Sequence, residues 1–426
     1  MRAVLSPVPR VPWRVQRIDA DGRWQSVEIH DRGPGIVSCL RRAYLMMGHD
    51  IAFERVSAAS GEALRFTWQE GWGHEAEAIA PHDAAASACG ALGFSHATLR
   101  GESHGATVAA ITESIDAGAP ALLGMDRAWE LVVGYDSERR EFLCDVSGFE
   151  QARVGEELPA YRAEDELRVI PMPDADWHGA THAPDQVARN PAFLLRGRPG
   201  ECADDEIART LGALLSACEP ARFGRMSPEL RREARSDFLG HGDTEFVTGT
   251  DAIRVWADHV GELTEATHDF GVIHANDTTL RLQIERGHDA AKYVAWAADN
   301  APDAMRPHLA AAHGPLEAAA LVPLPVCAWT CDLHTHDDLR DAIRKEAALV
   351  YIVDDDKGDL LGGIEPRSRR CPWGYSVLPE AEPFATARDD VVHGLRRIAD
   401  LRDIAATSLR DALDTQPHRA ALEARG

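Results

Sequence analysis

Residues 31–48 read DRGPGIVSCLRRAYLMMG, and this stretch decides the expected fold. Its opening loop holds two glycines around a proline, a composition that can continue neither a strand nor a helix. From Ile36 to Met47 apolar side chains recur at helical spacing, and Gly48 is typical of a helix end. We therefore predict a helix over 36–47, with Cys39 in its first turn, directly after the loop.

Strand-like segments surround this helix in the sequence. Apolar runs cover residues 121–123, 129–135, 141–146 and 166–170, and turn-forming residues separate them. Before the helix, residues 14–29 alternate polar and apolar around Asp21-Gly22, which is typical of a hairpin. Helices followed by an antiparallel sheet favour an α+β domain.

The second half of the chain has a different pattern. A polar, proline-rich stretch near 172–191 indicates a boundary, so we predict an α+β domain over 1–180 and a mainly helical domain over 191–426. Helical periodicity is found at 204–218, 227–238, 250–263, 277–298, 303–320, 336–347 and 385–414. A small hairpin insertion is expected near 349–364.

Charge and hydropathy exclude several classes of protein. The formal net charge of −24 is spread along the chain without a basic stripe, so a nucleic-acid partner is not expected. No apolar run reaches the roughly 18 residues that a membrane-spanning helix needs, and none resembles a signal peptide, so we expect a cytoplasmic protein without membrane contact. The 8 cysteines include no C-x-x-C pair, and we expect neither a metal nor a cofactor.

Two segments of the second half contain residue types that can bind metal ions. In His334-Thr335-His336 both imidazoles would share one face of a strand, but Thr335 followed by acidic residues is also typical of a helix start. Residues 354–359, DDDKGD, lack the ligand spacing of a calcium loop. The structural interpretation is favoured for both.

A helix-borne Cys39 followed by the strand run 131–136, LVVGYD, and then by Cys144-Asp145 resembles the papain-like cysteine peptidase fold. The chain is similar to bacteriocin-leader-processing peptidases and, over more of its length, to the butirosin biosynthesis protein H-like acyltransferases. The second resemblance also rests on Ser60-Gly61-Glu62-Ala63 before an aromatic stretch, and on helical segments 250–256 and 277–294.

The resemblance implies a function for Cys39. The thiolate, stabilised by a helix N-terminus, would attack a thioester or amide, and an amine would then resolve the acyl-enzyme. Asp145 would orient a histidine. The implied partners are an acyl carrier protein or a peptide substrate, and the helical half would serve as a lid, a homodimer interface or a carrier-protein dock.

The chain departs from this pattern at the histidine. Trp129 and Glu130 occupy its expected place, and neither can take a thiol proton and return it as histidine does. Three explanations stay open: a catalytically inactive protein that keeps the fold for binding, a histidine recruited from elsewhere, or a shifted strand alignment. The recruited histidine would be His30, His74 or His82.

Each candidate residue also has a structural interpretation. Cys39 is a small residue that can be buried on an amphipathic helix. Asp145 can be a strand-end carboxylate, and Glu130 can be either an acid in a cleft or a surface strand residue.

Overall fold

The computed structural model describes part of the 426-residue chain. The described residues are 1–9, 12–18, 24–30, 35–68, 83–99, 103–125, 128–145, 150–151, 161–172, 192–197, 203–220, 222–223, 246–264, 286–320, 322, 324–325, 352–353, 364–365 and 384–415.

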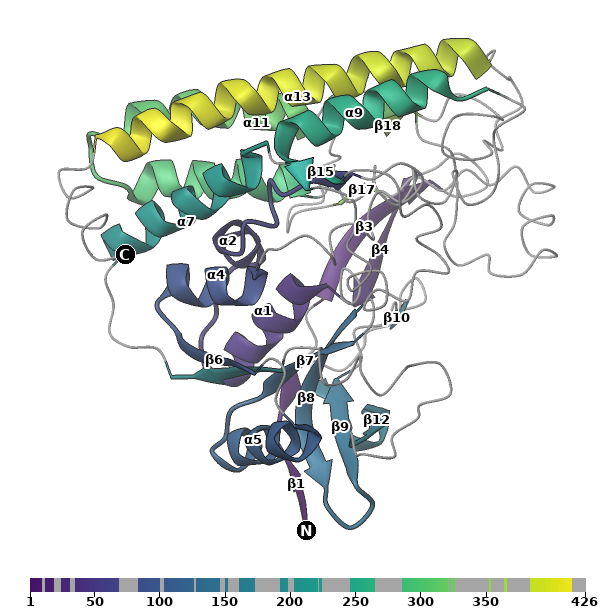
Figure 1. The fold of residues 1–426 in the computed structure, drawn as a ribbon, viewed down its shortest axis with the longest axis vertical. Helices are drawn as coiled ribbons and strands as arrows, with labels where there is room; N and C mark the ends of the chain where they lie inside the picture. The colour runs from purple at the N-terminus through teal and green to yellow at the C-terminus, as the bar shows by residue number, and fades with distance from the viewer. Residues whose placement is uncertain are drawn as a thin grey trace.

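An antiparallel sheet dominates the first half (Figure 1). Its strands follow one another in space as β12, β9, β8, β7, β13 and β6, and β1 pairs with the far end of β8. Their bounds are β1 Arg2–Val4, β6 Ser95–Leu99, β7 Ala121–Met125, β8 Ala128–Asp136, β9 Glu141–Asp145, β12 Arg168–Pro171 and β13 Ala192–Arg196. Gly134 lets β1 approach β8, because a Cβ there would lie 2.6 Å from the Ala3 carbonyl oxygen.

Helices cover both faces of this sheet. On one face lie α1 Ile36–Met46, α2 Phe53–Ala59 and α4 Ala84–Leu92, and on the other lies α5 His104–Asp116. Because strand side chains alternate, Leu131 and Val133 of β8 pack in the core beneath α1, whereas Val132 packs in the core beneath α5. This alternation decides which side chains of β8 and β9 can meet Cys39.

The second half is a helical layer (Figure 1). It contains α7 Ala203–Cys218, α9 Gly249–Glu262, a helix over 286–300, α11 Arg306–Ala320 and the 31-residue α13 Phe384–Asp414. The long α13 packs along α7, α9 and α11, with Val391, Leu395 and Leu409 fully buried on its inner face. Among the described helices, none combines the length and the apolar character that crossing a membrane requires.

Short strands complete the described structure. β3 Pro12–Ile18 and β4 Trp24–His30 form a hairpin, flanked by β10 Glu150–Gln151 and β17 Ile352–Val353. The other pairings join β2 Val8–Pro9 to β11 Tyr161–Arg162, β15 Phe246–Thr248 to both β5 Thr67–Trp68 and β14 Arg222–Phe223, and β16 Leu324–Pro325 to β18 Ile364–Glu365. A short 3-10 turn spans Glu164–Glu166.

The expected combination of helices and antiparallel sheet is confirmed, as is the hairpin around residues 14–29. One strand crosses the predicted boundary near 172–191: β13 lies past residue 191, yet it pairs with β6 and β7 in the sheet of the first half. Residues 349–351 and 354–363 of the expected hairpin lie outside the described residues, and the described strand β17 pairs with β3. The helices expected at 227–238 and 336–347 lie outside the described residues.

Candidate functional site

The backbone of Cys39 is already engaged within its helix. α1 begins at Ile36, so Cys39 is the fourth helical residue and belongs to the first turn, as predicted. Its N–H donates to the Gly35 carbonyl oxygen at 3.2 Å, which is the first hydrogen bond of the helix. The amides that a helix leaves without an intrahelical partner are those before this one. The N–H of Cys39 itself is therefore directed along the helix.

The side chain of Cys39 is fully buried. Its exposed fraction is 0%, and the Sγ atom donates to the Trp129 carbonyl oxygen of β8 at 3.3 Å. One turn further along α1, the Arg42 guanidinium Nη2 lies 3.8 Å from the same sulfur. The sulfur therefore lies between a carbonyl oxygen, which favours the protonated thiol, and a guanidinium donor, which favours the thiolate.

Asp145 lies beside Cys39 through Arg42. The residue ends β9 opposite Leu131, on the sheet face that α1 covers. Its Oδ2 atom is 3.1 Å from Arg42 Nε, and its Oδ1 atom is 2.5 Å from Arg162 Nε. The three side chains are at most 1% exposed, so one carboxylate lies between two buried guanidinium groups. Arginine suits this place because its planar group holds its charge and several donors in a fixed geometry.

Glu130 lies on the opposite face of the sheet from Cys39. It follows Trp129 and precedes Leu131 on β8, and alternate residues of a strand point to opposite faces. Its Oε1 atom is 2.8 Å from Nη1 of Arg168, and the register places Arg168 opposite Cys144, a member of the core beneath α5. Burial raises the pKa of the Glu130 carboxyl above its usual range, and the Arg168 guanidinium opposes that rise.

Other buried cysteines provide a reference for Cys39. Burial raises the pKa of Cys144 well above its ordinary value, and raises the pKa of Cys89 to about 12 and that of Cys218 to about 11. Cys89 also lies 3.4 Å from the Tyr44 hydroxyl. These thiols are packed in the cores and have the properties of unreactive cysteines.

The structure therefore brings together two of the three predicted site residues. Cys39 and Asp145 share Arg42, whereas Glu130 belongs to the other face of the sheet. Of the histidines considered as recruited bases, His30 is the last residue of strand β4, and His74 and His82 lie outside the described residues.

Sequence reasoning missed the two arginines that surround Asp145. Arg42 could have been found, because it lies three residues after Cys39 on the buried stripe of an amphipathic helix, where an arginine is unusual. Arg162 belongs to the two-residue strand β11, which has no local pattern that marks it as buried.

Comparisons of the sequence with known proteins do not identify a family for this chain. Neither the models of known protein families nor the sequences of curated proteins match the chain. Within the ranges that the structure describes, no group of three or more His, Cys, Asp or Glu side chains is placed to hold a metal ion. Both predicted acidic clusters, around His334 and at 354–359, lie outside those ranges.

Proposed function

We propose that this chain is a binding protein whose papain-like domain uses Cys39 as a structural residue and not as a nucleophile. The observation that carries the proposal is that both hydrogen-bond donors of Cys39 are engaged inside the protein. The N–H binds Gly35, and the fully buried thiol donates to Trp129.

The chemistry of cysteine catalysis explains why this arrangement favours binding. A nucleophilic cysteine needs a thiolate, a base that moves its proton, and donors that stabilise an oxyanion. Here the carbonyl oxygen of Trp129 accepts a hydrogen bond from the thiol at the strand position where a histidine is expected, and a carbonyl favours the neutral thiol. Asp145, the expected orienting carboxylate, is paired with two buried guanidinium groups.

The net charge indicates the chemistry of the partner. A chain with a formal charge of −24 repels polyanions and attracts cations at long range. Of the partners considered, we therefore favour a peptide or protein segment that is neutral or cationic. Binding of a cationic peptide should weaken as salt is raised from about 0.05 to 0.5 M, because screening shortens the range of the attraction.

Thiol labelling tests the role of Cys39. The native protein is treated with a small neutral thiol reagent at about pH 6, and labelling of each cysteine is followed by peptide mass spectrometry. Cys89 and Cys144 serve as buried references. A structural Cys39 labels no faster than these two, whereas labelling at least about tenfold faster than both refutes the proposal.

A cysteine-dependent acyl transfer or hydrolysis is the second candidate. It is favoured by one observation: the guanidinium of Arg42, 3.8 Å from the sulfur, is a cation that would stabilise a thiolate. In that case Arg42→Gln would slow labelling of Cys39 at pH 6. If Cys39 is structural, the same substitution leaves labelling as slow as before or accelerates it by loosening the core.

A further inference from the structure

The segment Ser60-Gly61-Glu62-Ala63, which sequence similarity singled out, has no part in the site around Cys39. It belongs to a stretch that we call the strap, residues 57–68, which runs from the last residues of α2 to the end of β5. All of its residues are buried. Because α2 packs against α1 and β5 pairs with β15 of the second half, the strap runs from one half of the molecule into the other.

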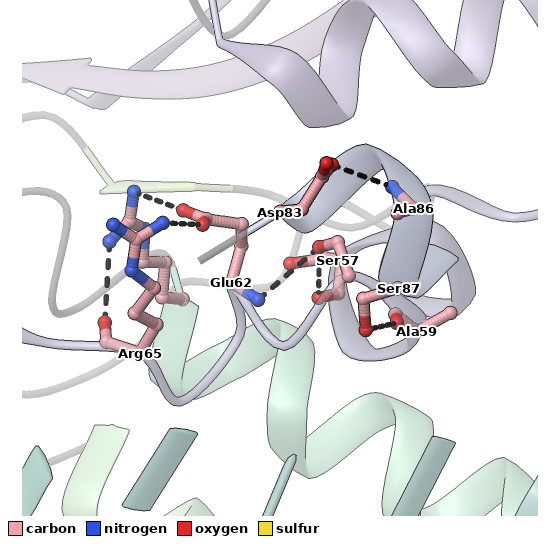
Figure 2. A network of polar contacts seen from close by, with 9 residues as sticks. Ser57, Ala59, Glu62, Arg65, Asp83, Ala86 and Ser87 are labelled. Carbon is pink, nitrogen blue, oxygen red and sulfur yellow. Dashed lines mark hydrogen bonds and ion pairs between the residues drawn. The ribbon is translucent and has the colours of Figure 1, made fainter. Parts of the chain in front are cut away.

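A tight turn shapes the start of the strap. Ser60 Oγ donates to the Ser57 carbonyl oxygen at 2.8 Å and accepts from the Glu62 N–H at 3.2 Å. Gly61 has a φ of +78°, a backbone conformation that residues other than glycine rarely adopt. The hydroxyl of Ser87, in α4, donates to the Ala59 carbonyl oxygen at 2.9 Å, so the turn is attached to the first half (Figure 2).

A buried ion triad connects the turn to the helical half. The Glu62 carboxylate lies 2.7 Å from Arg65 Nη1 and 2.9 Å from Nη2 of Arg286, the first described residue of the helical segment 286–300. The side chains of Glu62, Arg65 and Arg286 are 7%, 10% and 15% exposed. Figure 2 shows the Glu62 carboxylate facing the Arg65 guanidinium.

Three consecutive carbonyl groups of the strap accept hydrogen bonds from the helical half. The donors are Arg402 of α13 to Leu64 at 3.5 Å, Arg286 to Arg65 at 3.3 Å, and the Gly249 N–H of α9 to Phe66 at 2.9 Å. Gly249 has a φ of +73°, and a Cβ there would lie 2.5 Å from the Cys218 carbonyl oxygen, so a glycine is required for this contact. The second half thus supplies hydrogen bonds that a strap in water would take from solvent.

The apolar side chains of the strap divide between the two cores of the second half. Ala58, Ala63 and Leu64 pack with α7, α11 and α13, and Phe66 and Trp68 pack with α9 and α13. Trp68 stacks on Trp256 at 5.3 Å between ring centroids, and its indole N–H donates to His259 at 2.7 Å. Without the strap these helical cores would be incomplete.

Contacts outside the strap join the same two halves. Arg55 of α2 pairs with Glu206 of α7 at 2.5 Å, and its guanidinium lies 4.3 Å from the ring centroid of Trp296. Arg209 of α7 donates to the Ala91 carbonyl oxygen of α4 at 3.1 Å.

From these contacts we propose that the strap is a permanent lock, which makes the helical half an integral part of the fold and not a movable lid over Cys39. Opening the halves would expose the Glu62 triad, three bound carbonyls and five apolar side chains together. The halves therefore open and unfold as one cooperative unit.

Hydrogen exchange on the full chain, read by mass spectrometry, tests the lock. Glu62→Gln keeps the shape of the side chain but removes the charge between two buried guanidinium groups. Exchange of the most protected amides should accelerate by a similar factor, about a hundredfold, in α1 and in α13 alike. The control is Glu113→Gln on α5, an exposed residue, which should leave both helices unchanged. Acceleration in α13 with unchanged exchange in α1 would overturn the proposal.

A measurement on the unmodified protein keeps the test decisive if Glu62→Gln does not fold. Exchange is followed in increasing guanidinium chloride below the unfolding midpoint. A locked molecule gives one opening reaction, so the protected amides of α1 and α13 converge on the same free energy and the same dependence on denaturant. Two separate openings, one for each half, would show that the helical half moves independently.

Discussion

Replacing Asp145 by asparagine should strongly destabilise the protein. The carboxylate lies between Arg42 and Arg162, and all three side chains are at most 1% exposed. Asparagine keeps the shape but removes the charge, which leaves two buried guanidinium groups without this counter-charge. Breaking one buried ion pair costs about 3–5 kcal/mol. Because the total free energy of unfolding is about 5–15 kcal/mol for a typical protein, the loss is about a fifth or more of the stability.

Equilibrium unfolding in guanidinium chloride, followed by tryptophan fluorescence, measures this loss by linear extrapolation. The matched control is Asp50→Asn, because Asp50 pairs with Arg41 at 2.7 Å but is 82% exposed. An exposed pair contributes about 0–1 kcal/mol, so the control should change little. If Asp145→Asn also costs less than about 1 kcal/mol, the buried triad does not stabilise the fold in the way its geometry implies.

Four further substitutions have defined outcomes. Cys39→Ala should lower the free energy of unfolding by about 1–2 kcal/mol in denaturant titrations, because a buried thiol loses its hydrogen bond and leaves a small cavity; an unchanged midpoint would contradict this. Burial raises the pKa of the Glu130 carboxyl in the folded state, so its ionisation opposes folding. The Glu130→Gln variant should therefore become more stable relative to the unmodified protein as pH rises above 4.5. A difference in free energy of unfolding that does not vary with pH would refute the raised pKa. Gly249→Ala should cost more than about 1 kcal/mol because of its positive φ. By contrast Gly212→Ala, within α7 where an added Cβ would meet no heavy atom within 4 Å, should gain about 0.5–1 kcal/mol. Thermal unfolding distinguishes the two, and equal effects would refute the argument.

The fold was predictable where the spacing of apolar residues along the chain was regular. The helix at Cys39 follows from its spacing, because it buries one regular face, and β7, β8, β9 and β12 follow from short apolar runs that turn-forming residues separate. β13 was missed for a physical reason. Its run AFLLR is buried at four of five positions and so has no alternation, and its neighbours β6 and β7 are distant in sequence. A short apolar run of this kind does not show which sheet it joins.

The candidate site was predictable only in part. Cys39 and Asp145 were both identified, and the structure brings them to one sheet face. Since Glu130 lies between Trp129 and Leu131 on a strand, the two-residue period alone would have placed it on the other face from these neighbours. The pairing of Asp145 with Arg162 depends on a tertiary contact between short segments, for which the sequence has no signal.

Trapping of an acyl-enzyme tests most directly whether Cys39 is structural. The native full-length protein is incubated with an excess of an activated aryl thioester at about pH 7, and its intact mass and peptide masses are followed over time. A structural Cys39, fully buried with its thiol bound to the Trp129 carbonyl, predicts no acyl adduct on this residue. An acyl group that appears on Cys39 and is released by an added amine would contradict that role and establish the cysteine as a nucleophile.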